Sequence, residues 1–263
     1  MLLSLNAPDH LSQFILAAFN ITEAVTLIEE ASGGVNSRIY HSHWVARTQS
    51  STSYGFKVPA RGVTHALENE KLAADLGGLL NAPHASPVRQ LSGIDVAIPQ
   101  LGAGTVNITQ WVRDSKPVNE LNAAERTAIS HDCGSNSFFY QYGEWMAFGL
   151  FFGIRDRHGG NFMWNPAQRQ LCMIDLEDGF TRGNVADYGH VDLMCLAAAN
   201  PTQKAKQRSF LVCGFNRMYG RAKRHETSYR ALLINQTHTA TYQLQHFQPA
   251  RWALQAYLTA YWA

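Results

Sequence analysis

The sequence has neither a hydrophobic stretch long enough to cross a bilayer nor a basic segment at its amino terminus. Its longest apolar run, residues 145–154, is about half as long as the roughly 20 residues that a transmembrane helix needs. The first residues, MLLSLNAPDH, lack the basic flank of a cleaved secretory signal. These absences predict a soluble, cytoplasmic protein with no transmembrane segment, and they leave open delivery into another cell by a route without cleavage.

Cysteine and charge are also scarce. The cysteines form no CxxC pair and have no histidine at zinc-site spacing, so neither a zinc site nor a disulfide framework is expected. They are Cys133, Cys172, Cys195 and Cys213. Charged residues make up 16% of the 263 residues and hydrophobic residues 46%, with 13 Phe, 10 Tyr and 6 Trp. Such a composition buries enough apolar surface to offset chain entropy, which excludes global disorder.

The few charges are unevenly distributed. Residues 1–192 carry 13 Lys/Arg and 19 Asp/Glu, whereas residues 193–263 carry nine Lys/Arg and one acidic residue, Glu226. This basic C-terminal third indicates either a solvated helical face or a surface for an acidic partner. Nucleic acid is disfavoured, because the basic residues lack the interleaved aromatic side chains of a nucleic-acid groove. The basic residues concerned are Lys204, Lys206, Arg208, Arg217, Arg221, Lys223 and Arg224.

The pattern along the chain predicts an α+β fold with two lobes. Residues 1–103 form the expected β-rich N-lobe, in which one main helix, 64–80, interrupts short strand-like runs. These runs are 24–29, 39–47, 54–58, 86–91 and 94–101. Residues 104–263 form the expected, mainly helical C-lobe, and the glycines in 100–107 suit a hinge between the two lobes.

The predicted C-lobe combines several helices with one hairpin. The expected helices are 120–131, 137–152, 191–199, 207–224 and 250–261. Two short strands, 162–164 and 171–174, are joined by the turn NPAQRQ. Aromatic residues recur at steps of three and four within 137–152, which is typical of a helix face buried in a core. These aromatic residues are Phe138, Phe139, Tyr142, Trp145, Phe148 and Phe152.

Residues 153–180, GIRDRHGGNFMWNPAQRQLCMIDLEDGF, carry the strongest chemical signal. Asp156, His158 and Asn161 lie on one loop after a hydrophobic helix, and Asp175 ends an apolar strand. Phosphoryl transfer needs a carboxylate that orients the attacking hydroxyl and oxygen ligands that hold Mg²⁺ on the phosphates. Asp156 suits the first role, and Asn161 and Asp175 suit the second, because D-x-x-x-x-N followed by a strand-borne Asp is a kinase spacing.

The segments DRHGGNFM and MIDLEDGF resemble motifs of the atypical kinases of the phosphatidylinositol 3/4-kinase-like and actin-fragmin-kinase-like group. The close match covers only the segment 153–180, and the order of the lobes extends a looser resemblance over most of the chain. The resemblance implies a two-lobed, protein-kinase-like fold with ATP and Mg²⁺ as cofactors. It also implies that Asp156 is the catalytic aspartate, that His158 supports it, and that Asn161 and Asp175 bind Mg²⁺.

A kinase also needs a loop that covers the phosphates and a lysine on a following strand. The segment SGGVNSR lies between two strand-like runs and offers backbone amides to phosphate oxygens. Its predicted nucleotide contacts are Ser32, Gly33, Gly34 and Ser37. A plain hairpin turn is the alternative, since the segment lacks the pattern G-x-G-x-x-G. Lys57 lies in the strand 54–58 and is the predicted contact to the α- and β-phosphates, with an edge-strand charge as its alternative.

The helix 64–80 supplies the acidic partner that such a lysine requires. Glu68 and Glu70 compete for this role, and being two residues apart they point to different faces of the helix. Glu70 is preferred because the pattern ENEKLAADLGG resembles the corresponding helix of the actin-fragmin-like group. The strand 94–101 then resembles the segment that contacts adenine, with Gln100 and Leu101 as predicted contacts. Core packing explains that strand equally well.

Two features depart from the kinase pattern. Where many kinases have D-F-G, this chain has Asp175-Leu176-Glu177-Asp178-Gly179, which displaces the glycine and adds two carboxylates. Either added carboxylate suits a second metal ion or a basic neighbour. The segment 179–191 is short, so a long activation loop switched by phosphorylation is not expected.

The predicted function is Mg²⁺-dependent transfer of the ATP γ-phosphate to a hydroxyl, with a protein serine or threonine as the preferred acceptor. A phosphoinositide-type lipid kinase and a small-molecule kinase stay as alternatives. Only Arg182 is basic directly after Asp175, where a lipid headgroup needs basic residues, and the H-G-D loop usual in small-molecule kinases is absent. An AMP transferase with a kinase fold and an inactive nucleotide-binding module are alternatives of other classes.

Overall fold

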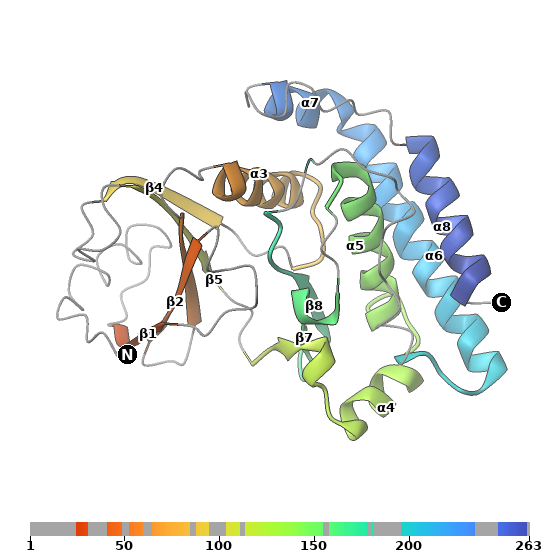
Figure 1. The fold of residues 1–263 in the computed structure, drawn as a ribbon. Helices are drawn as coiled ribbons and strands as arrows, with labels where there is room; N and C mark the ends of the chain where they lie inside the picture. The colour runs from red at the N-terminus through yellow and green to blue at the C-terminus, as the bar shows by residue number, and fades with distance from the viewer. Residues whose placement is uncertain are drawn as a thin grey trace. The chain divides into compact units, whose positions relative to one another are not determined.

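The computed structural model describes part of the chain. The described residues are 25–30, 41–48, 53–59, 65–84, 88–94, 104–110, 114–154, 158–177, 180, 196–234 and 247–261. They belong to two compact units, of which the first comprises Met1–Lys71 and Ser86–Arg113 and the second comprises Leu72–Ala85 and Asp114–Ala263. Helices and strands both contribute, as Figure 1 shows, so the predicted α+β class is confirmed.

The first unit is built on one antiparallel sheet. Its strands are β1 (Val25–Glu30), β2 (His41–Thr48), β3 (Ser53–Pro59), β4 (Val88–Ile94) and β5 (Gly104–Gln110). They lie in the order β1-β2-β3-β5-β4, with β3 hydrogen-bonded between β2 and β5. The predicted strands 24–29, 39–47, 54–58 and 86–91 are therefore present, with ends that differ by at most three residues.

The end of this sheet differs from the prediction. The sequence suggests a hinge at 100–107 and a lobe boundary after residue 103, whereas β5 begins at Gly104 and pairs with both β3 and β4. The first unit consequently extends to Arg113. The run GTVNITQ is rich in Thr, Val and Ile, which favour extended backbone, and this outweighs the glycine at its start. The predicted strand 94–101 lies outside the described residues except for Ile94, the last residue of β4.

One helix, α3 (His65–Leu79), contributes residues to both units. Its buried apolar side chains recur at helical spacing, as Leu67, Leu72, Ala73 and Leu76 show. The helix continues through the two glycines near its end and stops at Leu79, after which Asn81 adopts a left-handed φ of 51°. Asparagine tolerates that conformation better than most residues do, so it ends the helix where glycine is the usual choice.

Helix α5 (Phe138–Phe152) forms the centre of the second unit. Every one of its residues is buried, which confirms the predicted aromatic core stripe and extends it around the whole helix. The helix begins where the Ser137 hydroxyl accepts the backbone N–H of Tyr140, and it ends at Gly153, whose φ of 64° favours glycine. A helix that is buried on all sides has to be covered by other parts of the protein on all sides.

Helix α6 (Pro201–Arg224) supplies the largest part of that cover and runs along α5 (Figure 1). A Cβ atom added at Gly143 of α5 would come within 3.0 Å of the Leu211 backbone, and one added at Gly214 of α6 would do the same at the Tyr140 backbone. Real Cβ atoms do not approach other atoms so closely. The two helices therefore cross in near backbone-to-backbone contact, which only glycine allows at these two positions.

The remaining helices of the second unit lie around these two. They are α4 (Ala123–His131), α7 (Glu226–Ile234), α8 (Phe247–Tyr261) and the 3₁₀ helices η1 (Val118–Glu120) and η2 (Gly159–Asn161). Helix α6 begins six residues before the predicted start, α7 is not predicted at all, and α8 starts three residues early. The described part of the predicted helix 191–199, which is 196–199, is not α-helical.

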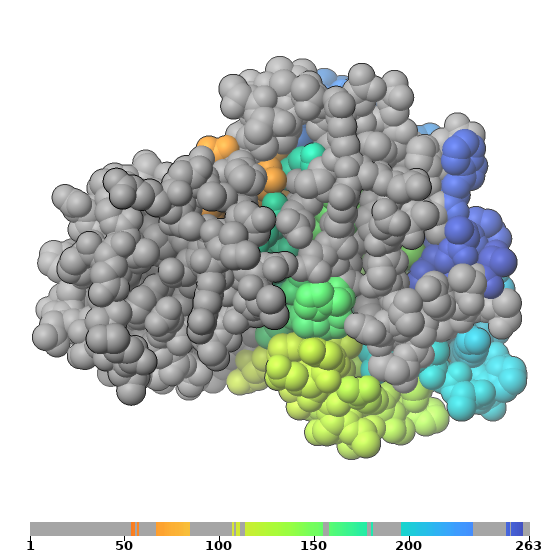
Figure 2. Space-filling model, in the orientation of Figure 1, coloured from red at the N-terminus to blue at the C-terminus, as the bar shows by residue number. Residues whose placement is uncertain are grey.

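A small sheet completes the second unit. Its strands are β6 (Lys116–Pro117), β7 (Phe162–Asn165) and β8 (Gln170–Met173), and β7 and β8 form the predicted hairpin. The hairpin turn is tied to the end of α4 by an ion pair between Arg169 and Asp132. Figure 2 shows η1 and α4, in yellow-green, beside the hairpin turn, in green, on the surface of this unit.

The structure bears on membrane-spanning helices and on the cysteines only within the described residues. Among the helices that the structure describes, none combines the length and the apolar character needed to cross a membrane. Cys133, Cys172 and Cys213 are free thiols, and Cys195 lies outside the described residues.

Candidate active site

The β7–β8 hairpin brings two of the predicted metal ligands to one end. Phe162 pairs with Met173 in the ladder, and the backbone N–H of Ile174 donates to the carbonyl oxygen of Asn161 at 2.8 Å. Asn161 directly precedes β7, and Asp175 follows Ile174 directly. Asn161 and Asp175, which are 14 positions apart in the sequence, therefore lie at the same end of the hairpin.

Helix α5 holds this hairpin through two polar side chains. The Gln141 side-chain carbonyl accepts the backbone N–H of Leu171 at 2.8 Å, and its amide donates to the carbonyl oxygen of Arg169 at 2.8 Å. The indole N–H of Trp145 donates to the carbonyl oxygen of Leu171 at 3.0 Å. Buried hydrogen bonds of this kind fix position, because an unpaired partner costs about 1–3 kcal/mol. Helix α5 therefore sets the position of β8.

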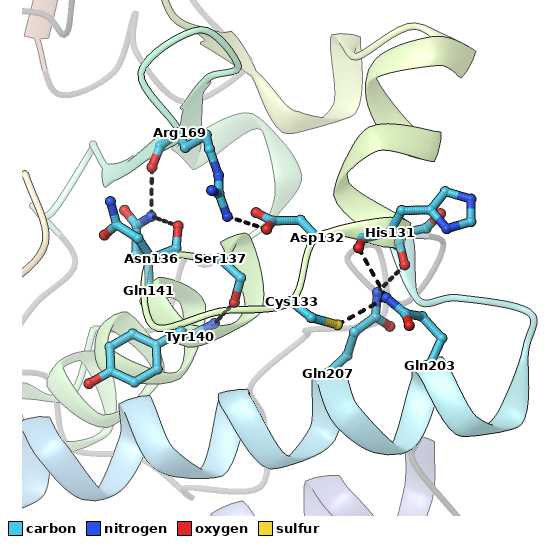
Figure 3. Close-up of polar contacts among 11 residues, drawn as sticks. His131, Asp132, Cys133, Asn136, Ser137, Tyr140, Gln141, Arg169, Gln203 and Gln207 are labelled. Atoms are coloured by element: carbon cyan, nitrogen blue, oxygen red, sulfur yellow. Dashed lines mark hydrogen bonds and ion pairs between the residues drawn. The ribbon is translucent and has the colours of Figure 1, made fainter.

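A second polar network fixes the segment between α4 and α5. As Figure 3 shows, Gln203 reaches from α6 to the carbonyl oxygen of His131 and to the sulfur of Cys133. The Gln207 amide donates to the carbonyl oxygen of Ser130 at 2.7 Å. Side-chain hydrogen bonds and the Arg169–Asp132 ion pair thus link the hairpin, α4, α5 and α6 to one another.

The loop before the hairpin is shaped by His158. Its Nδ1 atom accepts the backbone N–H of Gly160 at 3.0 Å, and its carbonyl oxygen accepts the N–H of Asn161 at 3.0 Å. A Cβ atom at Gly160 would lie 2.8 Å from the His158 ring, so glycine there lets the imidazole fold back onto the turn. The structure thus gives His158 a local role in forming the turn that presents Asn161. Asp156 lies outside the described residues.

Asp175 has an unusual backbone. Its φ of 59° is left-handed, a conformation that Asp and Asn reach more easily than most residues with a Cβ atom. Leu176, which follows, is 6% exposed and belongs to the core. Phe180 donates its N–H to the carbonyl oxygen of Phe152 at 2.7 Å, and the two rings lie 6.2 Å apart. The segment after Asp175 is therefore anchored to the core at Leu176 and at Phe180.

The donors at this hairpin end fit a magnesium ion. Mg²⁺ prefers oxygen ligands and is usually held by one or two carboxylates or amides while water and phosphate oxygens fill the other positions. Asn161 is buried at 6% exposure and Asp175 is partly buried, so both side chains are shielded in part from bulk water. In the described part of the chain no cluster of three or more His, Cys, Asp and Glu side chains suits a metal. One amide and one carboxylate from the protein are a ligand number that magnesium accepts when water and phosphate oxygens complete its coordination.

The first unit contains the lysine predicted to contact the phosphates and its predicted acidic partner. The Nζ atom of Lys57 on β3 lies 2.8 Å from Oε1 of Glu70 on α3, and both side chains are less than 10% exposed. The Asn107 amide on β5 donates to Oε2 of Glu70 at 3.0 Å and to the carbonyl oxygen of Leu67 at 2.8 Å. One buried carboxylate thus bridges a lysine and an amide on neighbouring strands.

This geometry decides the pairing that the sequence left between two residues. Glu70 forms the ion pair with Lys57, as preferred, while Glu68 is only partly buried. The role of Lys57 and Glu70 toward a nucleotide stays a prediction. Asn107 is the residue that sequence reasoning missed, because a single asparagine in a strand has no local signature. Ser32, Gly33, Gly34, Ser37, Gln100 and Leu101 lie outside the described residues.

Comparison with known proteins gives structural likenesses alone. No protein-family model and no curated protein matches the chain. The open conformation of CtTel1 is similar with a TM-score of 0.46 and 14% identity, over 91% of this chain and 12% of that chain. A structure of the FAT and kinase domain of CtTel1 is similar with a TM-score of 0.45 and 14% identity, over 90% of this chain and 22% of that chain. The Helicobacter pylori proinflammatory kinase CtkA is similar with a TM-score of 0.46 and 10% identity, over 87% of this chain and 90% of the CtkA chain.

This chain thus spans about one eighth of the first CtTel1 structure and most of the CtkA chain. All three TM-scores lie below 0.5, so these likenesses carry no argument about what the chain does.

Proposed function

We propose that this protein is an ATP- and Mg²⁺-dependent phosphotransferase that moves the γ-phosphate of ATP to a hydroxyl, with a protein side chain as the acceptor. The observation that carries the proposal is the buried pair of Lys57 and Glu70, 2.8 Å apart. A buried ion pair contributes little net stability compared with apolar residues of similar size, so its presence in a small sheet calls for a functional reason. Contact of the ammonium with phosphate oxygens supplies that reason.

The second unit supports the same reaction. Asn161 and Asp175 are the residues that would hold Mg²⁺, which contributes positive charge to the phosphate oxygens when it is bound. Asp156 then orients the acceptor hydroxyl and accepts its proton, and His158 shapes the turn that follows Asp156. Lys57 stabilises negative charge on the phosphates, and Glu70 and Asn107 keep the ammonium in place. Such a site acts by positioning and electrostatics and needs no covalent intermediate.

Incubation with labelled ATP tests the reaction. We expect label from γ-labelled ATP, and none from α-labelled ATP, to reach protein acceptors in a mixed protein substrate. The substitution Asp156→Asn is expected to abolish transfer while leaving ATP affinity within about threefold, since this residue acts on the acceptor and not on the nucleotide.

The controls separate the alternatives. Transfer of α-label to protein contradicts phosphoryl transfer and indicates an AMP transferase. Transfer of γ-label to phosphoinositides or sugars, with none to protein, contradicts the protein acceptor alone. An Asp156→Asn variant that keeps most of its turnover removes Asp156 from its catalytic role.

A further inference from the structure

A polar pocket in the second unit is not used by the proposed reaction. It has a volume of about 430 Å³ and lies between the end of α3, the start of α5 and the middle of α6. Its size is within the range of about 300–1,000 Å³ that small-molecule sites have. Neither Asn161 nor Asp175 lines it. The pocket is therefore a separate feature of this unit that the catalytic hairpin does not explain.

Two arginines of α6 and one glutamate of α5 set its charge. Glu144 is 5% exposed, and burial raises its pKa against the opposing effect of the two arginines. Arg221 lies closest, with Nη1 2.9 Å from Oε1 of Glu144, and it also donates to the carbonyl oxygen of Asn81 at 2.6 Å. Its side chain is 12% exposed. Arg221 and Glu144 form a close, structural ion pair that neutralises itself.

Arg217 is left with its charge largely uncompensated. Its Nε lies 3.7 Å from Glu144, and its side chain is 51% exposed. Its Nη1 group donates to the hydroxyl of Tyr140 at 3.0 Å, which raises the pKa of Arg217 and keeps it charged. Among the described residues its Nη2 group has no protein acceptor. A charged guanidinium with unused donors thus lines the pocket.

Further hydrogen-bond donors surround this guanidinium. Tyr140 accepts from Arg217 and keeps its own hydroxyl proton to donate. Ser135 and Asn136 line the pocket from the loop before α5, and His84 lines it from the loop after α3. Donors thus come from three different elements around one excess positive charge. A planar carboxylate presents two oxygens, whereas a phosphate monoester presents three and suits such a set better.

We propose that this pocket binds a phosphate monoester, with Arg217 as the main contact and with Tyr140, Ser135 and Asn136 as further donors. The source is either a free phosphorylated metabolite or a phosphorylated side chain, since both offer the same group. The sequence predicted an acidic partner for the basic C-terminal third. This pocket assigns such a partner to one residue of that region, Arg217 on α6. It does not depend on the proposed kinase activity.

Amide NMR with O-phospho-L-serine as the titrant tests the proposal. We expect saturable shifts of the amides of Gly77, Gly78 and Ser135, which line the pocket. L-serine and L-glutamate are expected to bind at least tenfold more weakly. A short phosphoserine peptide serves as a second arm: tighter binding of the peptide indicates a protein source, and tighter binding of the free amino acid indicates a metabolite. Absence of saturable shifts with either compound overturns the proposal, and so does equal binding of L-glutamate.

Three variants locate the site. Arg217→Gln is expected to weaken binding at least tenfold, and Arg224→Gln is the matched control, because it removes an exposed charge from the same helix outside the pocket. Gly78 lines the pocket, and a Cβ atom there meets nothing within 4 Å. Gly78→Met is therefore expected to fill part of the pocket without strain and to weaken binding equally. An equal loss in Arg224→Gln, or unchanged affinity in Arg217→Gln and Gly78→Met, overturns the proposal.

Discussion

Lys57 and Asn107 are opposite each other in the β3–β5 ladder, and the side chains of both reach the same carboxylate of Glu70. Lys57 contacts one oxygen and Asn107 contacts the other. Asn107 has no exposed surface at all. Both oxygens of the Glu70 carboxylate are thus engaged, which fixes its orientation and with it the position of the Lys57 ammonium. The three side chains therefore form one connected unit.

The first prediction concerns this unit. Removing one member of a buried ion pair leaves an uncompensated charge that costs about 3–5 kcal/mol. Lys57→Ala and Glu70→Ala are each expected to lower the transfer rate about 100-fold or more, and the double variant is expected to be little worse, because residues that act together are not additive. Rates of the two single variants and the double variant, checked for folding by circular dichroism, measure this coupling.

Glu68→Ala is the matched control on the same helix and is expected to change the rate less than threefold. Additive effects of Lys57 and Glu70, or a larger loss from Glu68→Ala, would reverse the assignment of the pair and leave the hairpin site unaffected.

The second prediction separates the charge of Asp175 from its backbone. Asparagine tolerates the left-handed φ of 59° nearly as well as aspartate but carries no charge. Asp175→Asn is therefore expected to keep the melting temperature within a few degrees and to lose most of the Mg²⁺-dependent gain in ATP affinity. Calorimetric titration of ATP with and without Mg²⁺ measures this gain. If Mg²⁺ does not change the affinity of the wild type for ATP, the assignment of Asp175 and Asn161 as Mg²⁺ ligands is wrong.

The third prediction concerns the crossing of α5 and α6. A methyl group at Gly143 or Gly214 would meet backbone of the other helix, which cannot move away as a flexible side chain can. Gly143→Ala and Gly214→Ala are each expected to destabilise the fold by about 3 kcal/mol or more, the upper end for overpacking. Urea unfolding measures the loss.

Gly220→Ala on the same helix provides the comparison. A Cβ atom there meets only the flexible end of Arg224 at 3.4 Å, so this change is expected to stabilise the protein by up to about 1 kcal/mol through helix propensity. Equal losses at all three glycines would show that the close crossing is not the cause.

The fourth prediction concerns alkaline pH. Burial raises the pKa of Tyr229 from 10.0 to about 12, with a smaller contribution from Glu226. Between these two values the folded protein keeps a proton that the unfolded chain releases, so stability falls as pH rises through this range. The wild type is expected to lose up to about 2 kcal/mol more than Tyr229→Phe between pH 9 and pH 11.5. Unfolding free energies at several pH values measure the difference, and parallel curves would contradict the assignment.

The parts of the fold that the sequence predicts are those with a local signal. The buried helix α5 and the β7–β8 hairpin follow from periodicity and turn residues. The choice of Glu70 as the partner of Lys57 follows from the resemblance of ENEKLAADLGG to the actin-fragmin-like helix, and all three features are present. Strand β5 also has a local signal, the four β-branched residues of GTVNITQ, but the neighbouring glycines favoured the hinge interpretation. Helix α7 has no such signal, because only His225 separates it from α6.

Other features depend on contacts between distant residues. Asn107 satisfies Glu70 from 37 positions away, and Arg217 meets Tyr140 from 77 positions away. Neither residue belongs to a local pattern, so a single sequence does not indicate what they contact. The left-handed backbone of Asp175 likewise has no local signature in the sequence, since aspartate adopts that conformation only occasionally.

The crossing at Gly143 and Gly214 also closes a long loop of the chain. The two glycines are 71 positions apart, and the chain between them contains Asp156, Asn161 and Asp175. The segment that carries these proposed site residues is thus a loop whose ends meet at the crossing, and closing a loop of that length costs conformational entropy. A substitution at either glycine is therefore expected to weaken the contact that closes this loop, although neither glycine is among the residues proposed to act in the reaction.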